Sequence, residues 1–136
     1  MDKPEIVVSA TDMERLDKLL ESASAEEWPG KSQLEAELDR ARVVDSHEIP
    51  ASVVTMNSSV RFRVVESGEE FTMTLVYPRD MDDSGQTLSI MAPVGSALLG
   101  LSEGEEIEWP RPGGGVMHVR IDKVLYQPER AGEHHR

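Results

Sequence analysis

Two groups of apolar side chains near the start of the chain recur at intervals of three and four residues. This spacing places each group on one face of a helix and predicts helices over about 12–23 and about 32–45. The first group contains Met13, Leu16, Leu20 and Ala23, and the second contains Leu34, Leu38 and Ala41. Pro29 and Gly30 lie between the two segments and predict a break there.

Each predicted helix begins with a Thr/Ser-x-x-Glu sequence, in which the hydroxyl and the glutamate cap backbone amides reciprocally. Thr11 with Glu14 forms the first of these capping boxes, and Ser32 with Glu35 forms the second. Two capped helices with a short connection predict an antiparallel αα-hairpin, a short coiled coil. We expect this hairpin to be an N-terminal domain over 1–50.

Beyond a polar linker at 45–52, apolar positions alternate with polar ones, which is the period of half-buried β-strands. The predicted strands cover 53–55, 60–65, 71–77, 88–91, 107–109 and 116–126. A short helix is expected over 94–99, because Pro93 stands at its start and Gly100 follows its end. The predicted fold class is therefore α+β: the helical hairpin is followed by an antiparallel β domain with one short helix over 51–136.

The composition narrows the classes of partner. Of 136 residues, 14 are Lys or Arg and 26 are Asp or Glu, so the formal net charge is −12. Phosphate backbones and anionic membranes need a concentrated positive surface, so we expect no direct binding to nucleic acid or membrane. The absence of cysteine excludes disulfides and thiolate metal sites. With no long apolar segment and no signal-peptide pattern, the sequence predicts a cytoplasmic protein.

Sequences that resemble catalytic or metal-binding motifs are incomplete. Residues 80–85 match the first half of a calcium loop, but Met91 stands where the bidentate glutamate is needed. The four histidines lack the spacing of metal ligands, and no G-x-S-x-G sequence surrounds a serine. We therefore expect no enzyme activity, no bound metal and no cofactor.

The predicted tip of the hairpin is a candidate contact for a partner protein. Glu26, Glu27 and Trp28 fall there, and an exposed tryptophan flanked by acids can anchor a partner. Alternatively, Trp28 folds back and caps the end of the helix pair.

A second candidate contact is the turn Met91-Ala92-Pro93, where a predicted strand meets the short helix. An apolar turn at this place can form a docking surface. Alternatively, Met91 fills the core, and residue chemistry alone leaves both interpretations open.

The segment Ser89–Glu105 (SIMAPVGSALLGLSEGE) resembles the C-terminal domain of the Gre transcript-cleavage factors, of the GreA/GreB transcription elongation factor family. That family has a strand, a Ser/Ala-Pro turn, a small helix ending Ala-Leu-Leu/Ile-Gly, and a later Pro-Gly-Gly turn, which Pro112–Gly114 matches. Further segments resemble the regulators of nucleoside diphosphate kinase within this family, and the resemblance covers nearly the whole chain from residue 5. These segments are Ala36–Ala41, Val53–Ser58, Thr74–Pro78 and Tyr126–Glu129.

The resemblance implies an FKBP-like C-terminal domain that docks on the rim of the RNA polymerase secondary channel through Met91, Ala92 and Pro93. Many Gre factors have an aspartate before the Ser-Pro, where this chain has Met91, so the resemblance implies the apolar contact from Pro93 but not a charged one. A helix over 12–23 is only ~18 Å long, much shorter than a Gre hairpin, so acids at its tip would stay outside the channel. We therefore expect a monomeric polymerase-binding regulator that cleaves no transcript and competes with Gre factors for the rim.

Two alternative functions remain open. The resemblance also implies a regulator of nucleoside diphosphate kinase that acts directly or through expression. An FKBP-like fold further raises a prolyl isomerase, which is less favoured because that chemistry needs an aromatic-lined pocket and fold does not fix function. The aromatic residues of the predicted β domain are Phe62, Phe71, Tyr77, Trp109 and Tyr126.

Overall fold

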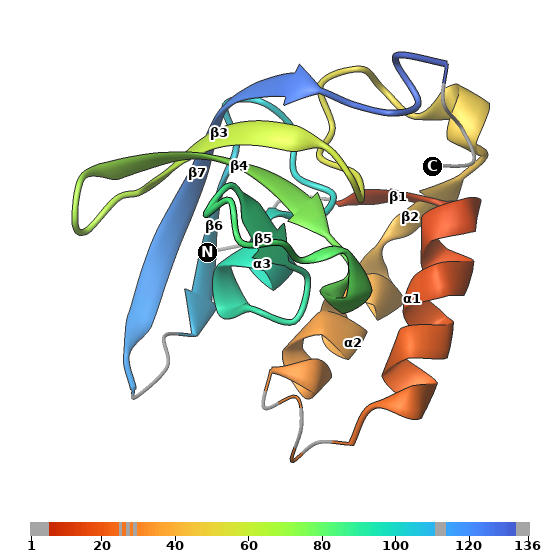
Figure 1. The fold of residues 1–136 in the computed structure, drawn as a ribbon, viewed down its shortest axis with the longest axis horizontal. Helices are drawn as coiled ribbons and strands as arrows, with labels where there is room; N and C mark the ends of the chain where they lie inside the picture. The colour runs from red at the N-terminus through yellow and green to blue at the C-terminus, as the bar shows by residue number, and fades with distance from the viewer. Residues whose placement is uncertain (1–5, 25, 27, 29, 111–113, 133–136) are drawn as a thin grey trace.

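The computed structural model describes residues 6–24, 26, 28, 30–110 and 114–132, and it confirms the α+β fold class. Two helices near the N-terminus lie side by side next to a curled sheet (Figure 1). In chain order the elements are β1 (Val7–Ser9), α1 (Ala10–Ser22), α2 (Lys31–Arg40), β2 (Arg42–Val44), the 3-10 helix η1 (Ser46–Glu48), β3 (Ser59–Val64), β4 (Glu69–Val76), the 3-10 helix η2 (Pro78–Asp80), β5 (Thr87–Ser89), α3 (Pro93–Leu98), β6 (Glu106–Pro110) and β7 (Val116–Tyr126).

The two N-terminal helices are present, but the predicted capping boxes are wrong. Helix α1 begins at Ala10, and the hydroxyl of Ser9 accepts a hydrogen bond from the backbone N–H of Asp12 at 3.0 Å. Ser9 is as good an N-cap residue as Thr11, and it lies directly after β1, so the helix starts there. Helix α2 has Gly30 at its N-cap with no side-chain cap, and Ser32 lies inside the helix.

Helix α2 ends at Arg40, not near residue 45 as its apolar spacing predicted. The chain turns extended at Ala41, and β2 then pairs with β1 in parallel. The backbone N–H of Arg42 donates to the carbonyl of Ile6 at 2.9 Å, which starts this pairing. The strand pairing therefore ends the helix, because residues 42–44 include two β-branched valines that suit an extended backbone.

The main sheet has five strands in the order β5-β4-β3-β7-β6. The long strands β3, β4 and β7 lie where the period-two pattern predicts them, and β3 pairs antiparallel with both neighbours. Two details differ from the prediction. Segment 53–55 makes only an isolated bridge from Val53 to Ser102, and β5 pairs with β4 in parallel, because the chain returns through η2 before it re-enters the sheet.

One hydrophobic core joins side chains from both predicted domains. The two parts approach closely at Gly100, where a Cβ would lie 2.6 Å from the Cβ of Ile6 and φ is +82°. The backbone N–H of Val7 donates to the carbonyl of Gly100 at 3.2 Å. The largest fully buried side chains of this core include Trp28, Leu16, Leu34, Phe62, Leu98 and Leu101. The N-terminal strand is thus packed directly on the β domain; the domain boundary at residue 50 stays a prediction.

Candidate functional site

The turn between β5 and α3 carries the candidate residues Met91, Ala92 and Pro93, and hydrogen bonds fix its shape. The hydroxyl of Ser89 accepts from the backbone N–H of Met91 at 3.1 Å, and the carbonyl of Ser89 accepts from Ala92 at 3.0 Å. One turn later, the hydroxyl of Ser96 donates to the carbonyl of Ile90 at 2.6 Å. Pro93 is the first residue of α3, where a proline fits because that N–H needs no helical partner.

Gly95 lets helix α3 approach this turn closely. A Cβ at this position would lie 2.1 Å from the carbonyl oxygen of Ser89, a distance that no real side chain tolerates. The strand end and the helix are therefore in backbone contact. Together with the hydrogen bonds, this contact makes the turn a rigid, preformed surface.

The surface of this turn is half-buried and uncharged. Met91, Ala92 and Pro93 are each partly exposed, and Met91 also packs against the hydrophobic core. Both interpretations of Met91 thus describe part of its environment. No charged residue occurs anywhere between Asp83 and Glu103, in a chain of which 29% is charged.

The tip of the hairpin offers less than its sequence suggests. Trp28 is only 1% exposed and belongs to the core, so its indole ring is not available as a surface anchor. Its Nε1 has no hydrogen-bond partner among the described residues. Glu26 is exposed, and Glu27 lies outside the described residues. A contact of this tip with a partner stays a prediction.

A buried polar junction connects α1 to the β domain. Asp12, only 3% exposed, accepts a hydrogen bond from the backbone N–H of Met56 at 3.2 Å, and the hydroxyl of Tyr77 donates to it at 3.5 Å. Burial, reinforced by the negative charge of Glu129, raises the pKa of Asp12 to about 6. Burial beside Asp12 also raises the pKa of Tyr77. This carboxylate therefore fixes the first turn of α1 against the sheet, at an electrostatic cost.

No pattern in the sequence predicts this junction. Asp12 occupies the first turn of a helix, where an acid is ordinary because it interacts favourably with the helix dipole. The one signal in the sequence is its i,i+4 neighbour Leu16, which belongs to the apolar face of the helix and is fully buried in the structure. Met56 and Tyr77 are more than 40 positions away, so no local pattern reveals them as its partners.

The segment that resembles a calcium loop forms a turn closed by its own side chains. Asp82 accepts hydrogen bonds from the backbone N–H of Ser84 at 3.0 Å and from its hydroxyl at 2.6 Å. These hydrogen bonds lower the pKa of Asp82. Throughout the described part of the chain, no group of three His, Asp or Glu side chains is placed to hold a metal ion.

The aromatic side chains give little support to a prolyl isomerase. Phe62, Tyr77 and Trp109 are each at most 6% exposed and lie in the core. Phe71 stacks on Phe62 with ring centroids 5.4 Å apart. An aromatic-lined pocket for a proline side chain would need such rings at its surface.

None of the described helices has the length and apolar character that crossing a membrane requires.

Comparison with known proteins places this fold and turn in a family. Residues 49–126 match the family model for the C-terminal part of the GreA/GreB transcription elongation factors, and residues 4–44 match the model of the Rnk N-terminus. The chain belongs to the GreA/GreB family, and its N-terminal hairpin is of the Rnk type. The turn and α3 lie within the first of these matched ranges.

Three relatives define the similarity more closely. The chain is 48% identical over 134 residues to the regulator of nucleoside diphosphate kinase of Escherichia coli K12, covering 98% of both chains. It is 30% identical over 128 residues to the elongation factor GreA of Desulfovibrio desulfuricans, covering 88% of this chain and 79% of the relative. A solved GreA/GreB structure from Nitrosomonas europaea has 64% sequence identity and a TM-score of 0.72, covering 91% of this chain and 100% of that one.

Proposed function

We propose that this protein is a transcription regulator that binds RNA polymerase at the rim of the secondary channel through Met91, Ala92 and Pro93. The observation that supports this most is the rigid, uncharged turn on an otherwise strongly acidic chain. A preformed apolar surface loses little conformational freedom on binding, so more of its contact energy appears as affinity. Relatives named as transcription elongation factors support RNA polymerase as the partner.

The length of the hairpin supports a regulator that cleaves no transcript. Helix α1 has 13 residues, which corresponds to about 20 Å at ~1.5 Å per residue. Helix α2 has only 10 residues. A protein held at the rim by the turn would therefore keep Glu26 and Glu27 outside the channel. It would instead occupy the site of the cleavage factors and compete with them by mass action.

Polymerase capture tests the docking surface. Replacing Pro93→Asp puts a charge into the turn, and we expect it to abolish retention by immobilised core RNA polymerase. The matched control is Pro50→Asp, which makes the same change at an exposed position in the segment between η1 and β3. We expect the control to bind like the wild type. Retained binding of a folded Pro93→Asp variant, checked by circular dichroism, would contradict the proposal.

Transcript cleavage tests the role of the hairpin. Added to a backtracked elongation complex, the protein should yield no shortened RNA, and it should slow cleavage by a Gre factor added with it. The double variant Glu26→Gln with Glu27→Gln should inhibit as well as the wild type, because docking is assigned to the turn. Cleavage that disappears in the double variant would show that the tip reaches the active site.

A second candidate function follows from the name of the Escherichia coli relative, a regulator of nucleoside diphosphate kinase. Assays of purified kinase with and without the protein separate direct regulation from regulation through transcription. A change in kinase turnover at equal enzyme concentration would favour a direct contact.

A further inference from the structure

The outer face of the main sheet carries two rows of like charges on neighbouring strands. Arg61 of β3 stands directly opposite Lys123 of β7, and Arg63 stands opposite Arg120. Arg61, Arg120 and Lys123 are exposed, and Arg63 is half-buried. On β3, Val60 and Phe62 flank Arg61 and are buried, and on β7 the nearby buried positions are Val119, Ile121 and Val124. A register shift at Asp122 adds one residue to β7, so Arg120 and Lys123 both lie on the face that points away from the core, with Arg61 and Arg63. We name these four residues the cationic rows.

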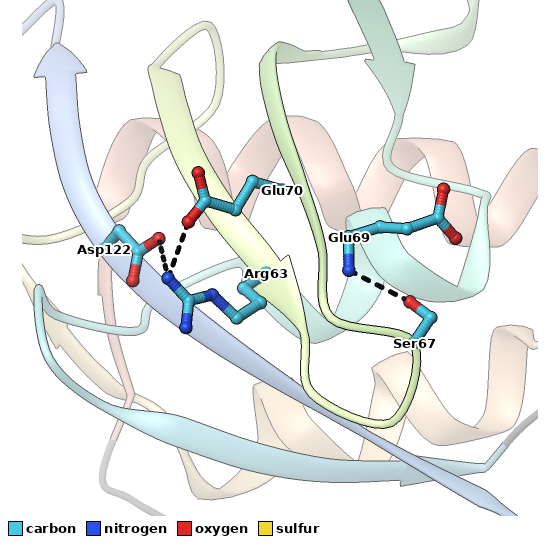
Figure 2. A network of polar contacts seen from close by, with 5 residues as sticks. All are labelled: Arg63, Ser67, Glu69, Glu70 and Asp122. Carbon is cyan, nitrogen blue, oxygen red and sulfur yellow. Dashed lines mark hydrogen bonds and ion pairs between the residues drawn. The ribbon is translucent and has the colours of Figure 1, made fainter.

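Of these four cations, only Arg63 has ion-pair partners among the residues that the structure describes. Arg63 lies between two carboxylates, 2.6 Å from Glu70 and 3.7 Å from Asp122 (Figure 2). Elsewhere in the described chain, Arg61, Arg120 and Lys123 have no carboxylate at ion-pair distance. The Arg61–Lys123 row is therefore the uncompensated part.

Folding does not require this row. Like charges directly opposite each other on antiparallel strands destabilise the sheet, and uncharged residues such as threonine suit the same positions. The chain itself places Thr72 at the next register position, opposite Arg61 on β4. Charges that cost stability on an open sheet face, in a chain of net charge −12, are suited to an interaction outside the fold.

We propose that the cationic rows bind an acidic, extended segment of a partner protein. This inference uses a face separate from the Met91-Ala92-Pro93 turn and does not depend on the proposed docking there. The two rows are separated by two residues along β3, or about 6.6–6.8 Å. An extended peptide repeats its side chains on one face at the same spacing, so one carboxylate can meet the Arg61–Lys123 row while the next meets Arg120, which has no ion pair among the described residues.

A nucleic acid fits this face less well. Single-stranded bases bind to sheet faces by stacking on aromatic rings, and Phe62 and Phe71 instead stack on each other within the core layer. The net negative charge of the whole chain matters less for a short segment, because physiological salt screens charges beyond about 8 Å.

Binding of a labelled peptide tests the proposal. The probe is a fluorescein-labelled decapeptide of alternating Glu and Thr, titrated with the protein at physiological ionic strength and followed by fluorescence anisotropy. We expect Arg61→Ser with Lys123→Ser to weaken binding at least tenfold. The matched control, Lys18→Ser with Arg79→Ser, removes the same charge at exposed positions elsewhere and should stay within twofold of wild type.

Two further measurements separate binding from folding. The exchanged variant Arg61→Lys with Lys123→Arg keeps both charges and should retain binding. Removing the like-charge row should leave the melting temperature unchanged or raise it. If the double serine variant fails to fold, the exchanged variant tests the proposal instead. Loss of peptide binding by the exchanged variant would overturn the proposal.

Three other results would also overturn it. The first is that the wild type does not bind the peptide. The second is that both double variants lose affinity equally, which would mean that net charge alone decides. The third is that a uridine decamer binds more tightly than the peptide and is lost in the same serine variant, which would assign the face to nucleic acid.

Discussion

Replacing the buried carboxylate of Asp12 by an amide should stabilise the protein at neutral pH. In the variant Asp12→Asn, the amide oxygen can still accept from the N–H of Met56, and Tyr77 can still form a hydrogen bond to the side chain. The variant therefore keeps the geometry of the junction. It removes the charge that burial and Glu129 disfavour.

The magnitude follows from the pKa of Asp12, which rises from 3.8 to about 6 on folding. This rise corresponds to about 3 kcal/mol, since each pKa unit is worth about 1.4 kcal/mol. Because the pKa of Asp12 is higher in the folded state, the unfolded chain loses the proton of Asp12 at a lower pH than the folded protein does. Stability from this group is thus complete below pH 3.8 and is lost as the pH rises to about 6. Loss of a favourable helix-dipole contact offsets up to about 1 kcal/mol, so we expect a net gain of about 2 kcal/mol.

Urea unfolding at pH 7.5 and pH 4.0 measures this difference. Asp12→Asn should raise the free energy of unfolding at pH 7.5, and the gain should shrink or vanish at pH 4.0. The matched control is Asp17→Asn, an exposed acid on the same helix, which should change stability little at either pH. A variant less stable than wild type at pH 7.5, or a gain equal at both pH values, would refute the reasoning.

Four further substitutions test the close backbone contacts and the N-cap of α1 by thermal unfolding. Gly95→Ala should destabilise by about 1–3 kcal/mol or more, because its Cβ would lie 2.1 Å from a backbone carbonyl; an unchanged melting temperature would contradict that close approach. Gly100→Ala should cost more than about 1 kcal/mol, because φ is +82° and Ile6 occupies the space of the added Cβ. Ser9→Ala should cost about 1 kcal/mol through loss of the N-cap, whereas Thr11→Ala should cost less; the reverse order would restore the capping box at Thr11.

The sequence predicts correctly those elements whose structure depends on one local pattern. Strand β3 and the first part of β7 alternate buried with more exposed side chains, and a shift by one residue would expose their apolar set. Strand β7 matches its predicted range, and α3 begins at Pro93 as predicted. These elements are readable because burial on one face fixes both their period and their register.

The predictions were wrong where contacts between distant segments determine the structure. Strands β1 and β2 have three residues each, and the whole hairpin lies between them in the sequence. Neither segment contains a pattern that predicts its pairing with the other. This pairing ended α2 five residues early and moved the start of α1 to the end of β1. The turn Met91-Ala92-Pro93 was found as a candidate from its neighbours in sequence, whereas Asp12 was not, because its partners are distant.

The buried junction and the Gly100 contact have a common consequence for the hairpin. A helix pair tied to a domain only by a flexible linker could point in many directions, and its tip would take no fixed position on a partner. Here the hairpin is held before and after β1, by Ile6 next to Gly100 and by Asp12, in the first turn of α1, which accepts a hydrogen bond from Met56. A partner that binds the turn therefore also positions the hairpin. Weakening the Asp12–Met56 junction should therefore change the position of the hairpin on that partner more than it changes the affinity of the protein for the partner.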